Sequence, residues 1–214
     1  MIVPDSINLK YLLGFKKIVD AVDARFVIVC GGGSIARKYI YALRDAHGSA
    51  YLQSLAGIAV TRLNARFMTY LFGKEANEGI PMDMKHVASL LERNKIVFCG
   101  ALRSASQETS DGTAAKLAHY LGADFINITD VQGLYDKNPK RFKDAAFIPE
   151  ISWKNFLSRA NKMKYYAGQH FVLDQSAAEL IKKHRTKTYI AGPDVKNLER
   201  LLRGKKFMGT RIEG

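Results

Sequence analysis

The chain has little of what marks a secreted or membrane-bound protein. Only two cysteines, Cys30 and Cys99, occur in 214 residues, which excludes the dense disulfide framework of small secreted domains. No apolar run reaches the roughly 18–20 residues that cross a bilayer, and the first residues lack the basic segment and apolar core of a signal peptide. We therefore expect a soluble, cytoplasmic protein without membrane association.

Metal-binding signatures are also lacking. The five histidines lie on separate predicted elements, without the spacing of metal ligands, so no metal site built by the protein is expected. Cys30 and Cys99 each end a short apolar run just before a glycine. These matching positions predict two neighbouring strand ends with buried thiols, rather than a disulfide or a metal pair.

Acidic residues are scarce relative to basic ones: 20 Asp and Glu stand against 33 Lys and Arg, giving a net charge of +13 and a pI near 9.7. Such an excess attracts polyanions, including nucleic acid. The basic residues are scattered, however, with local clusters only at 137–143, 182–187 and 203–206, and no zinc-finger or aromatic RNA-binding signature accompanies them. Nucleic-acid binding is therefore an unlikely main function and stays as an alternative.

Apolar periodicity predicts an α/β protein in which short strands alternate with helices. Helices are expected at 6–22, 34–47, 51–71, 85–93, 111–121, 152–161, 176–184 and 194–202, and strands at 26–30, 96–99, 124–128, 188–191 and 209–212. This alternation is typical of a mostly parallel sheet covered by helices on both faces. Polar or glycine-rich segments follow three strands, at 31–37, 100–111 and 129–139, and ligands of such folds bind at the carboxyl ends of strands.

The first of these segments, Gly31-Gly32-Gly33 followed by Arg37, predicts a phosphate site. A strand that ends in glycines and continues as a helix presents free backbone N–H groups and a positive dipole end. Glycine lets an anion approach the main chain, and Arg37 adds a charged fork. The alternative is a tight turn that simply needs glycine. The segment matches neither G-x-G-x-x-G nor the P-loop motif.

The other two segments allow both structural and ligand-binding roles. Thr109 or Ser110 can cap the helix that begins near residue 111, and the same hydroxyls can hold a phosphate or a sugar. In the segment 129–140, Tyr135 can stack on a base and Asp130 can orient Mg²⁺-bound phosphates or a lysine. A simple Asx turn is the alternative there.

Five motifs together resemble the amino acid kinase superfamily, and most closely the archaeal uridylate kinases. They occur in the family's order over nearly the whole chain: Gly31–Tyr39, Gly57–Arg66, Thr109–Asp111, Thr129–Pro139 and Gly209–Glu213. The resemblance implies a three-layer αβα sandwich with a mostly parallel central sheet. It also implies transfer of the ATP γ-phosphoryl group to UMP, giving UDP, with Mg²⁺, by a homohexamer.

The resemblance further assigns roles to parts of the chain and to single residues. One amino acid kinase domain covers 1–214, with an acceptor-binding part over about 1–110 and an ATP-binding part over about 111–214. The residues implied to act in catalysis are Arg37 and Asp130; those implied to bind ATP are Gly33, Arg37, Thr129, Tyr135 and Asn138; those implied to bind UMP are Gly32, Ser54, Ser104, Ser106, Thr109 and Ser110.

The chain departs from the family in several places. Family members begin with a strand and a Gly-Gly-Ser loop that grips the transferred phosphoryl group, whereas Met1 aligns just after that loop. We expect that Met1 is an internal methionine of a longer protein; the alternative is a nucleotide-binding pseudokinase. Ser54 and Asn138 replace aspartates, and the 100–111 loop lacks the family's Gly-x-His-Pro-Gly pattern. A different small phosphate or carboxylate acceptor therefore remains an alternative substrate.

Overall fold

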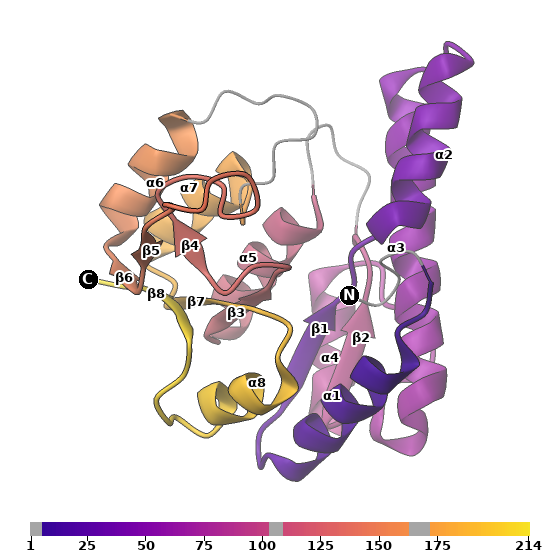
Figure 1. Ribbon diagram of the computed structural model, residues 1–214. Helices are drawn as coiled ribbons and strands as arrows, with labels where there is room; N and C mark the ends of the chain where they lie inside the picture. Colours follow the sequence, from indigo (N-terminus) through magenta and orange to yellow (C-terminus); the bar gives the residue numbers. More distant parts are fainter. Residues whose placement is uncertain (1–5, 103–108, 163–171) are drawn as a thin grey trace. The chain divides into compact units, whose positions relative to one another are not determined.

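The computed structural model describes residues 6–102, 109–162 and 172–214, which form two compact units, Met1–Thr113 and Ala114–Gly214 (Figure 1). Each unit combines helices with a small sheet, so the chain is an α/β protein as predicted. In the described parts of the chain, no helix combines the length and the apolar character that crossing a membrane requires.

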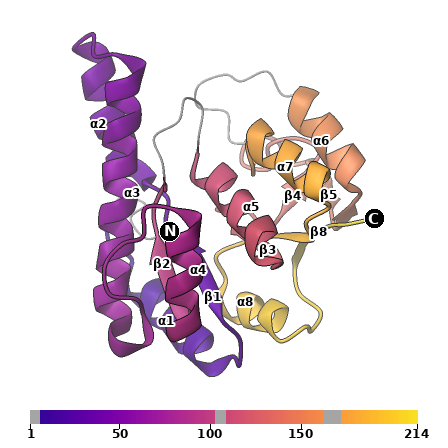
Figure 2. The same ribbon diagram turned by 180° about the vertical axis from the view of Figure 1, so that it is seen from behind.

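In its described residues, the N-terminal unit contains a pair of parallel strands and four complete α-helices. In chain order its elements are α1 (Leu9–Ala21), β1 (Phe26–Val29), α2 (Gly33–Asp45), α3 (Ala50–Phe72), the 3-10 turn η1 (Gly73–Glu75), α4 (Met84–Arg93) and β2 (Ile96–Cys99), and α5 (Ser110–Leu121) begins in it. Strands β1 and β2 pair in parallel from Phe26–Ile96 to Val29–Cys99. Both views show α2 lying alongside α3 (Figures 1 and 2).

The core of this unit is built around β2, whose four residues are all buried. An aromatic series joins α1, α3 and β2: the Phe15 and Phe72 ring centroids are 6.2 Å apart, and those of Phe72 and Phe98 are 4.7 Å apart. The second edge of β2 is covered by a buried side chain, because Asn77 accepts a hydrogen bond from the Phe98 N–H (2.7 Å) and donates one to its carbonyl (3.2 Å).

The two cysteines lie where the sequence predicts them. Cys99 ends β2, and the Cys30 N–H donates to the Cys99 carbonyl at 2.8 Å, just beyond β1. Both are buried free thiols. Burial raises the pKa of Cys99 to about 12 and raises that of Cys30 further, with the neighbouring Cys99 adding to the shift of Cys30. The prediction of neighbouring strand ends with structural thiols is therefore confirmed.

The C-terminal unit contains a four-stranded mixed sheet in the order β3-β7-β8-β6 and a separate two-stranded ribbon of β4 and β5. Its elements are β3 (Phe125–Ile128), β4 (Leu134–Tyr135), β5 (Phe147–Ile148), β6 (Glu150–Ile151), α6 (Trp153–Lys162), α7 (Gln175–His184), β7 (Thr188–Ala191), α8 (Val195–Leu202) and β8 (Gly209–Ile212). The pairs β3–β7 and β6–β8 are parallel, whereas β7–β8 is antiparallel. The predicted mostly parallel arrangement is confirmed, although the antiparallel β7–β8 pair makes the four-stranded sheet mixed and the β4–β5 ribbon is also antiparallel.

One hydrophobic cluster fills this unit, to which α5, α6, α7 and the strands contribute. Its large members are Phe125, Leu134, Phe156, Leu173, Ile181, Ile190 and Ile212. Helix α8 is not part of the cluster; it buries Leu198 and Leu201 and lies on the opposite side of the strands from α6 and α7 (Figure 1). The 3-10 turn η1 and the two-residue strands β4, β5 and β6 were not predicted, because such short elements leave no periodicity to read.

Candidate active site

The glycine turn after β1 leads directly into α2. The N-cap of α2 is Gly32, which provides no capping side chain. The N-caps of α3, α4 and α7 are Ser49, Asp83 and Asp174, whose side chains accept an N–H of the first turn. Gly33 has φ +62°, a backbone conformation that side chains with a Cβ rarely adopt. The turn therefore leads into a helix N-terminus that has no capping side chain. Anion-binding sites use helix N-termini of this kind.

Helix α3 holds this turn in place. The buried Asn64 side chain donates a hydrogen bond to the Gly31 carbonyl at 2.7 Å. A Cβ added at Gly32 would lie 2.3 Å from the Ala36 Cβ and 3.6 Å from the Thr61 Cγ2. The turn is therefore closely packed, and glycine at position 32 is a steric requirement as well as a means of ligand approach.

A second glycine turn, after β2, is fixed by the same helix. The Thr61 hydroxyl accepts a hydrogen bond from the Ala101 N–H at 2.9 Å and donates one to the Ile58 carbonyl at 2.7 Å. A Cβ at Gly100 would lie 2.6 Å from the Thr61 Oγ1, so only glycine fits there. The guanidinium of Arg62 donates to the carbonyls of Ala101 (3.1 Å) and Leu102 (3.0 Å).

The start of α5 lies beside the first glycine turn. A Cβ at Gly31 would be 3.6 Å from the Ser110 Oγ. The Thr109 hydroxyl accepts a hydrogen bond from the Gly112 N–H at 2.9 Å, and the Thr109 carbonyl accepts one from Thr113 at 2.9 Å, so Thr109 is the predicted cap. Two helix N-termini, those of α2 and α5, therefore meet near the end of β1, and their dipoles favour negative charge at that place.

The structure does not bring all the site residues predicted in the N-terminal unit together. Ser54 lies on α3 seven residues before Thr61, about 10 Å away along the helix axis, and Arg37 is exposed in the second turn of α2. Ser104 and Ser106 lie outside the described residues. The roles given to these residues stay predictions.

In the C-terminal unit, Thr129 and Asp130 lie in the turn between β3 and β4, whereas Tyr135 and Asn138, which like Thr129 are predicted to bind ATP, lie in β4 and just after it. The Thr129 N–H donates to the Ala191 carbonyl at 2.9 Å, which extends the β3–β7 ladder. Asp130 forms an exposed ion pair with Lys140. The Asn138 Oδ1 accepts a hydrogen bond from the Lys140 N–H at 2.9 Å, which is the Asx turn that the sequence allowed. Asp130, Asn138 and Lys140 are thus one connected group.

Tyr135 and the start of β4 are held by β5 and β8. The Tyr135 ring packs edge-on against Phe147, with centroids 5.3 Å apart. The buried Thr210 hydroxyl accepts a hydrogen bond from the Leu134 N–H at 2.8 Å, and a Cβ at Gly133 would lie 2.8 Å from this hydroxyl. The arrangement repeats that of Gly100, Ala101 and Thr61: a buried threonine binds the N–H after a glycine and fills the place of the missing Cβ.

The supporting residues Thr61, Arg62, Asn64 and Thr210 are the part of the site that sequence reasoning missed. They belong to motifs that resemble the family, at 57–66 and 209–213, yet no role follows from their spacing. A usable signal did exist, since Thr61 and Asn64 interrupt the apolar face of a long helix. Buried polar side chains of this kind are hydrogen-bonded, which indicates that they fix a neighbouring segment.

Comparison with known proteins identifies the class to which this fold and these turns belong. The model of the amino acid kinase family matches residues 12–192, so the chain is a member of the amino acid kinase family. Relatives found within that family include uridylate kinases of archaea. The one from Methanobrevibacter smithii is 32% identical over 195 residues, covering 90% of this chain and 85% of the relative.

Two further comparisons extend over the whole chain. The uridylate kinase of Thermococcus kodakarensis is 30% identical over 217 residues, covering 100% of this chain and 95% of the relative. The crystal structure of uridylate kinase from Archaeoglobus fulgidus superposes with a TM-score of 0.87 at 28% identity, covering 99% of this chain and 95% of that one. The predicted resemblance to archaeal uridylate kinases and the predicted fold class are thereby confirmed.

Proposed function

We propose that this protein is a UMP kinase, which transfers the γ-phosphoryl group of ATP to UMP and releases UDP and ADP. The observation that carries this proposal is the similarity to archaeal uridylate kinases over 90–100% of the chain. ATP and UMP are metabolites of the cell interior, so the proposal places the protein in the cytoplasm.

The chemistry of the transfer agrees with the residues present. Phosphoryl transfer requires in-line positioning and neutralisation of charge more than a covalent nucleophile. In the N-terminal unit, Gly32, Thr109 and Ser110 lie where the N-termini of α2 and α5 favour the phosphate of the acceptor. Gly33 and Arg37 are assigned to the ATP phosphates, Arg37 as the cation that stabilises the developing charge.

The C-terminal unit provides the other ATP-binding residues of the proposal. Tyr135 offers an aromatic ring to the nucleotide base, and Thr129 and Asn138 offer hydrogen bonds. Asp130 keeps the ammonium of Lys140 beside the turn, where it can face a phosphate. Among the residues that the structure describes, no group of three or more His, Cys, Asp or Glu side chains could hold a metal ion. Mg²⁺ would therefore be bound mainly by the phosphate oxygens of ATP, as is common for this ion.

The proposal is tested with a panel of acceptors. We expect MgATP-dependent formation of UDP from UMP, and the release of ADP measures the turnover. CMP, a carboxylate and isopentenyl phosphate serve as the competing acceptors. Preferential turnover of another acceptor would make that acceptor the substrate in place of UMP. ATP binding without turnover of any acceptor would favour a non-catalytic nucleotide-binding protein.

A matched pair of glycine variants links the activity to the turn. Gly33 and Gly204 have nearly the same φ, +62° and +66°, so alanine at either position imposes a similar backbone cost of about 1–2 kcal/mol. We expect Gly33→Ala to lower kcat/KM at least tenfold, whereas Gly204→Ala leaves it within about twofold. Equal losses in both variants would show that the effect comes from stability alone.

We further infer assembly into a homohexamer. Leu52, Leu63 and Tyr70 are exposed by 48%, 63% and 74%, and their spacing places them on one face of α3. Exposed apolar side chains on one face of a helix are typical of a contact with another protein, and a second copy of the chain is the occupant that we propose. Light scattering should give six chains per particle, and Leu63→Lys with Tyr70→Lys should reduce that number.

A further inference from the structure

The exposed face of α6 carries only uncharged polar and basic side chains. Helix α6 has the sequence WKNFLSRANK, in which no residue is acidic. Phe156 and Ala160 are buried in the core, whereas Lys154, Arg159 and Lys162 are exposed. Lys154 and Lys162 are separated by eight residues, about 12 Å along the helix axis. The helix therefore presents a row of cations to solvent.

The fold adds the end of α7 to this row. Helices α6 and α7 pack side by side (Figures 1 and 2), and α7 ends with Lys182 and Lys183. One surface groove is lined by Lys154, Leu157, Ser158, Asn161, Lys162 and Lys182. A second groove runs along the other flank of α6, past Asn155, Ser158, Arg159 and Lys162 to Glu150 of β6. We call this surface, formed by the two grooves, the α6–α7 basic face.

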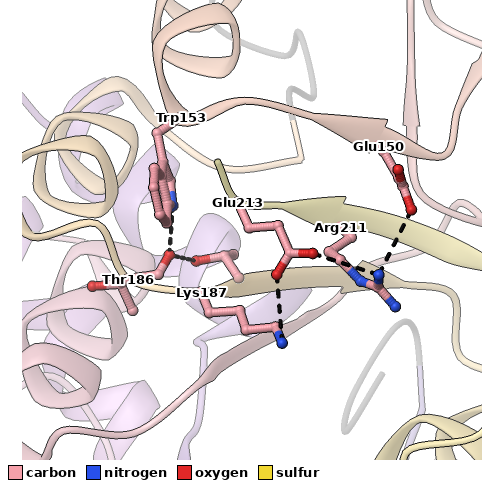
Figure 3. Close-up of polar contacts among 7 residues, drawn as sticks. Glu150, Trp153, Thr186, Lys187, Arg211 and Glu213 are labelled. Atoms are coloured by element: carbon pink, nitrogen blue, oxygen red, sulfur yellow. Dashed lines mark hydrogen bonds and ion pairs between the residues drawn. The ribbon is translucent and has the colours of Figure 1, made fainter.

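Carboxylates do not neutralise this face. Among the described residues, Glu150 is the one acidic residue that lines the grooves, and it lies 3.7 Å from the guanidinium of Arg211. Glu213 is bound by Lys187 and Arg211, each at 3.4 Å (Figure 3). Within the described ranges, no carboxylate lies within 4.0 Å of the cations of Lys154, Arg159, Lys162 or Lys182. Residues 114–214 as a whole contain 19 Lys and Arg against 10 Asp and Glu.

From this surface we propose a second function: the α6–α7 basic face binds the phosphodiester backbone of nucleic acid, independently of the proposed kinase activity. Lys and Arg side chains interleaved with Ser and Asn donors are the groups that contact phosphate oxygens. An anionic membrane fits less well, because the apolar side of α6 is turned into the core and no apolar side is left to enter a bilayer.

The contacts of this face are with the backbone rather than with bases. Stacking of bases needs exposed aromatic rings, but the ring of Trp153, at the start of α6, is half-buried and its Nε1 donates to the Thr186 carbonyl at 3.0 Å (Figure 3). Binding should therefore depend strongly on salt and weakly on base sequence.

The test compares two triple variants of the full chain. The groove variant carries Lys154→Ala, Lys162→Ala and Lys182→Ala. The control variant carries Lys196→Ala, Arg200→Ala and Lys205→Ala, which removes the same charge from exposed positions on and just after α8. Fluorescence anisotropy measures the binding of labelled 20-nucleotide RNA and DNA over a range of KCl concentrations, and sedimentation measures the binding of phosphatidylserine vesicles.

We expect the groove variant to lose at least about tenfold in affinity at 100 mM KCl. Its slope of log K against log salt should become less negative by about 2, roughly 0.7 for each lost phosphate contact. The control variant should change affinity less than about threefold. A variant with Arg at positions 154, 162 and 182 should keep the binding, and far-UV circular dichroism with kinase turnover should confirm folding.

Three results would overturn the proposal. Equal losses in the groove and control variants would mean that net charge alone attracts the oligonucleotides. Binding of the vesicles without binding of the oligonucleotides would assign the face to a membrane. A preference above tenfold for one homopolymer sequence over another would show base recognition, which the described residues of this face do not provide.

Discussion

Replacing Thr61 with valine tests how the acceptor side of the site is held together. Valine keeps the shape and the β-branching of threonine, so its effect on the helix itself is small. It removes the hydroxyl that accepts the Ala101 N–H at 2.9 Å. Ala101 is only 5% exposed, so its N–H would be left without a partner and without water. An unsatisfied buried donor costs about 1–3 kcal/mol.

The same helix contains a matched control. Thr69 is exposed by 7%, as Thr61 is, and its hydroxyl donates to the carbonyl three residues earlier at 2.8 Å, as Thr61 does at 2.7 Å. Of these two threonines, only Thr61 also accepts an N–H from another segment in the hydrogen bonds of the described residues. Thr69→Val should therefore change the free energy of unfolding by no more than about 0.5 kcal/mol, in line with substitutions that orphan no partner.

Urea denaturation measures the difference, provided that the m-value stays constant among the variants. We expect Thr61→Val to lower the free energy of unfolding by about 1–3 kcal/mol and to raise the KM for UMP, because the segment after β2 loses its anchor. Thr210→Val should have a similar cost through the Leu134 N–H. If Thr61→Val and Thr69→Val are equally stable, the threonine at position 61 does not anchor the turn.

Three further predictions concern other parts of the chain. Burial raises the pKa of both thiols above the value of 9.0 for a free cysteine, so folding favours their protonated forms. The stability that the thiols contribute should therefore be fully present below about pH 9 and fall by up to about 1.4 kcal/mol per pH unit per thiol as the pH rises toward 12. Unfolding measured as a function of pH should no longer show this decline when Cys30→Ala and Cys99→Ala are combined. Arg62→Lys, which cannot bridge two carbonyls in the same way, should raise the KM for UMP several-fold while kcat changes little; an unchanged KM would argue against the bridge. Asp130→Asn, which releases Lys140, should lower kcat at least about tenfold but shift the unfolding free energy by no more than about 1 kcal/mol, because exposed ion pairs contribute little to stability; a stability loss without a loss of kcat would contradict the catalytic role.

Much of the fold could be predicted from the sequence because its signals are local. The strand at 96–99 is a short apolar run, and the structure has it with the same bounds. Helix α3 was expected over 51–71 and extends over Ala50–Phe72, since apolar spacing and the cap at Ser49 both lie within the segment. Strands β4, β5 and β6 are too short to carry such a pattern, and they exist through pairing with distant strands.

The candidate site divides in the same way. Glycines after β1, the cap at Thr109 and the Asx turn at Asn138 follow from neighbouring residues, so the sequence indicated them or left them as alternatives. The hydrogen bond from Asn64 to Gly31 joins residues 33 positions apart, and that from Leu134 to Thr210 joins residues 76 apart. No local pattern encodes such pairings.

By itself, the sequence determined the class of the protein, the order of most of its elements, the glycine turn and the buried state of its two thiols. These features follow from composition, periodicity and turn chemistry, which act between near neighbours. Only the tertiary structure decided which buried side chains hold the turns, since Thr61, Asn64 and Thr210 act on segments far away in the chain. It also decided that the lysines of α6 and α7, which are about 20 residues or more apart in sequence, lie along one groove, because the packing of two helices on a common core sets that distance.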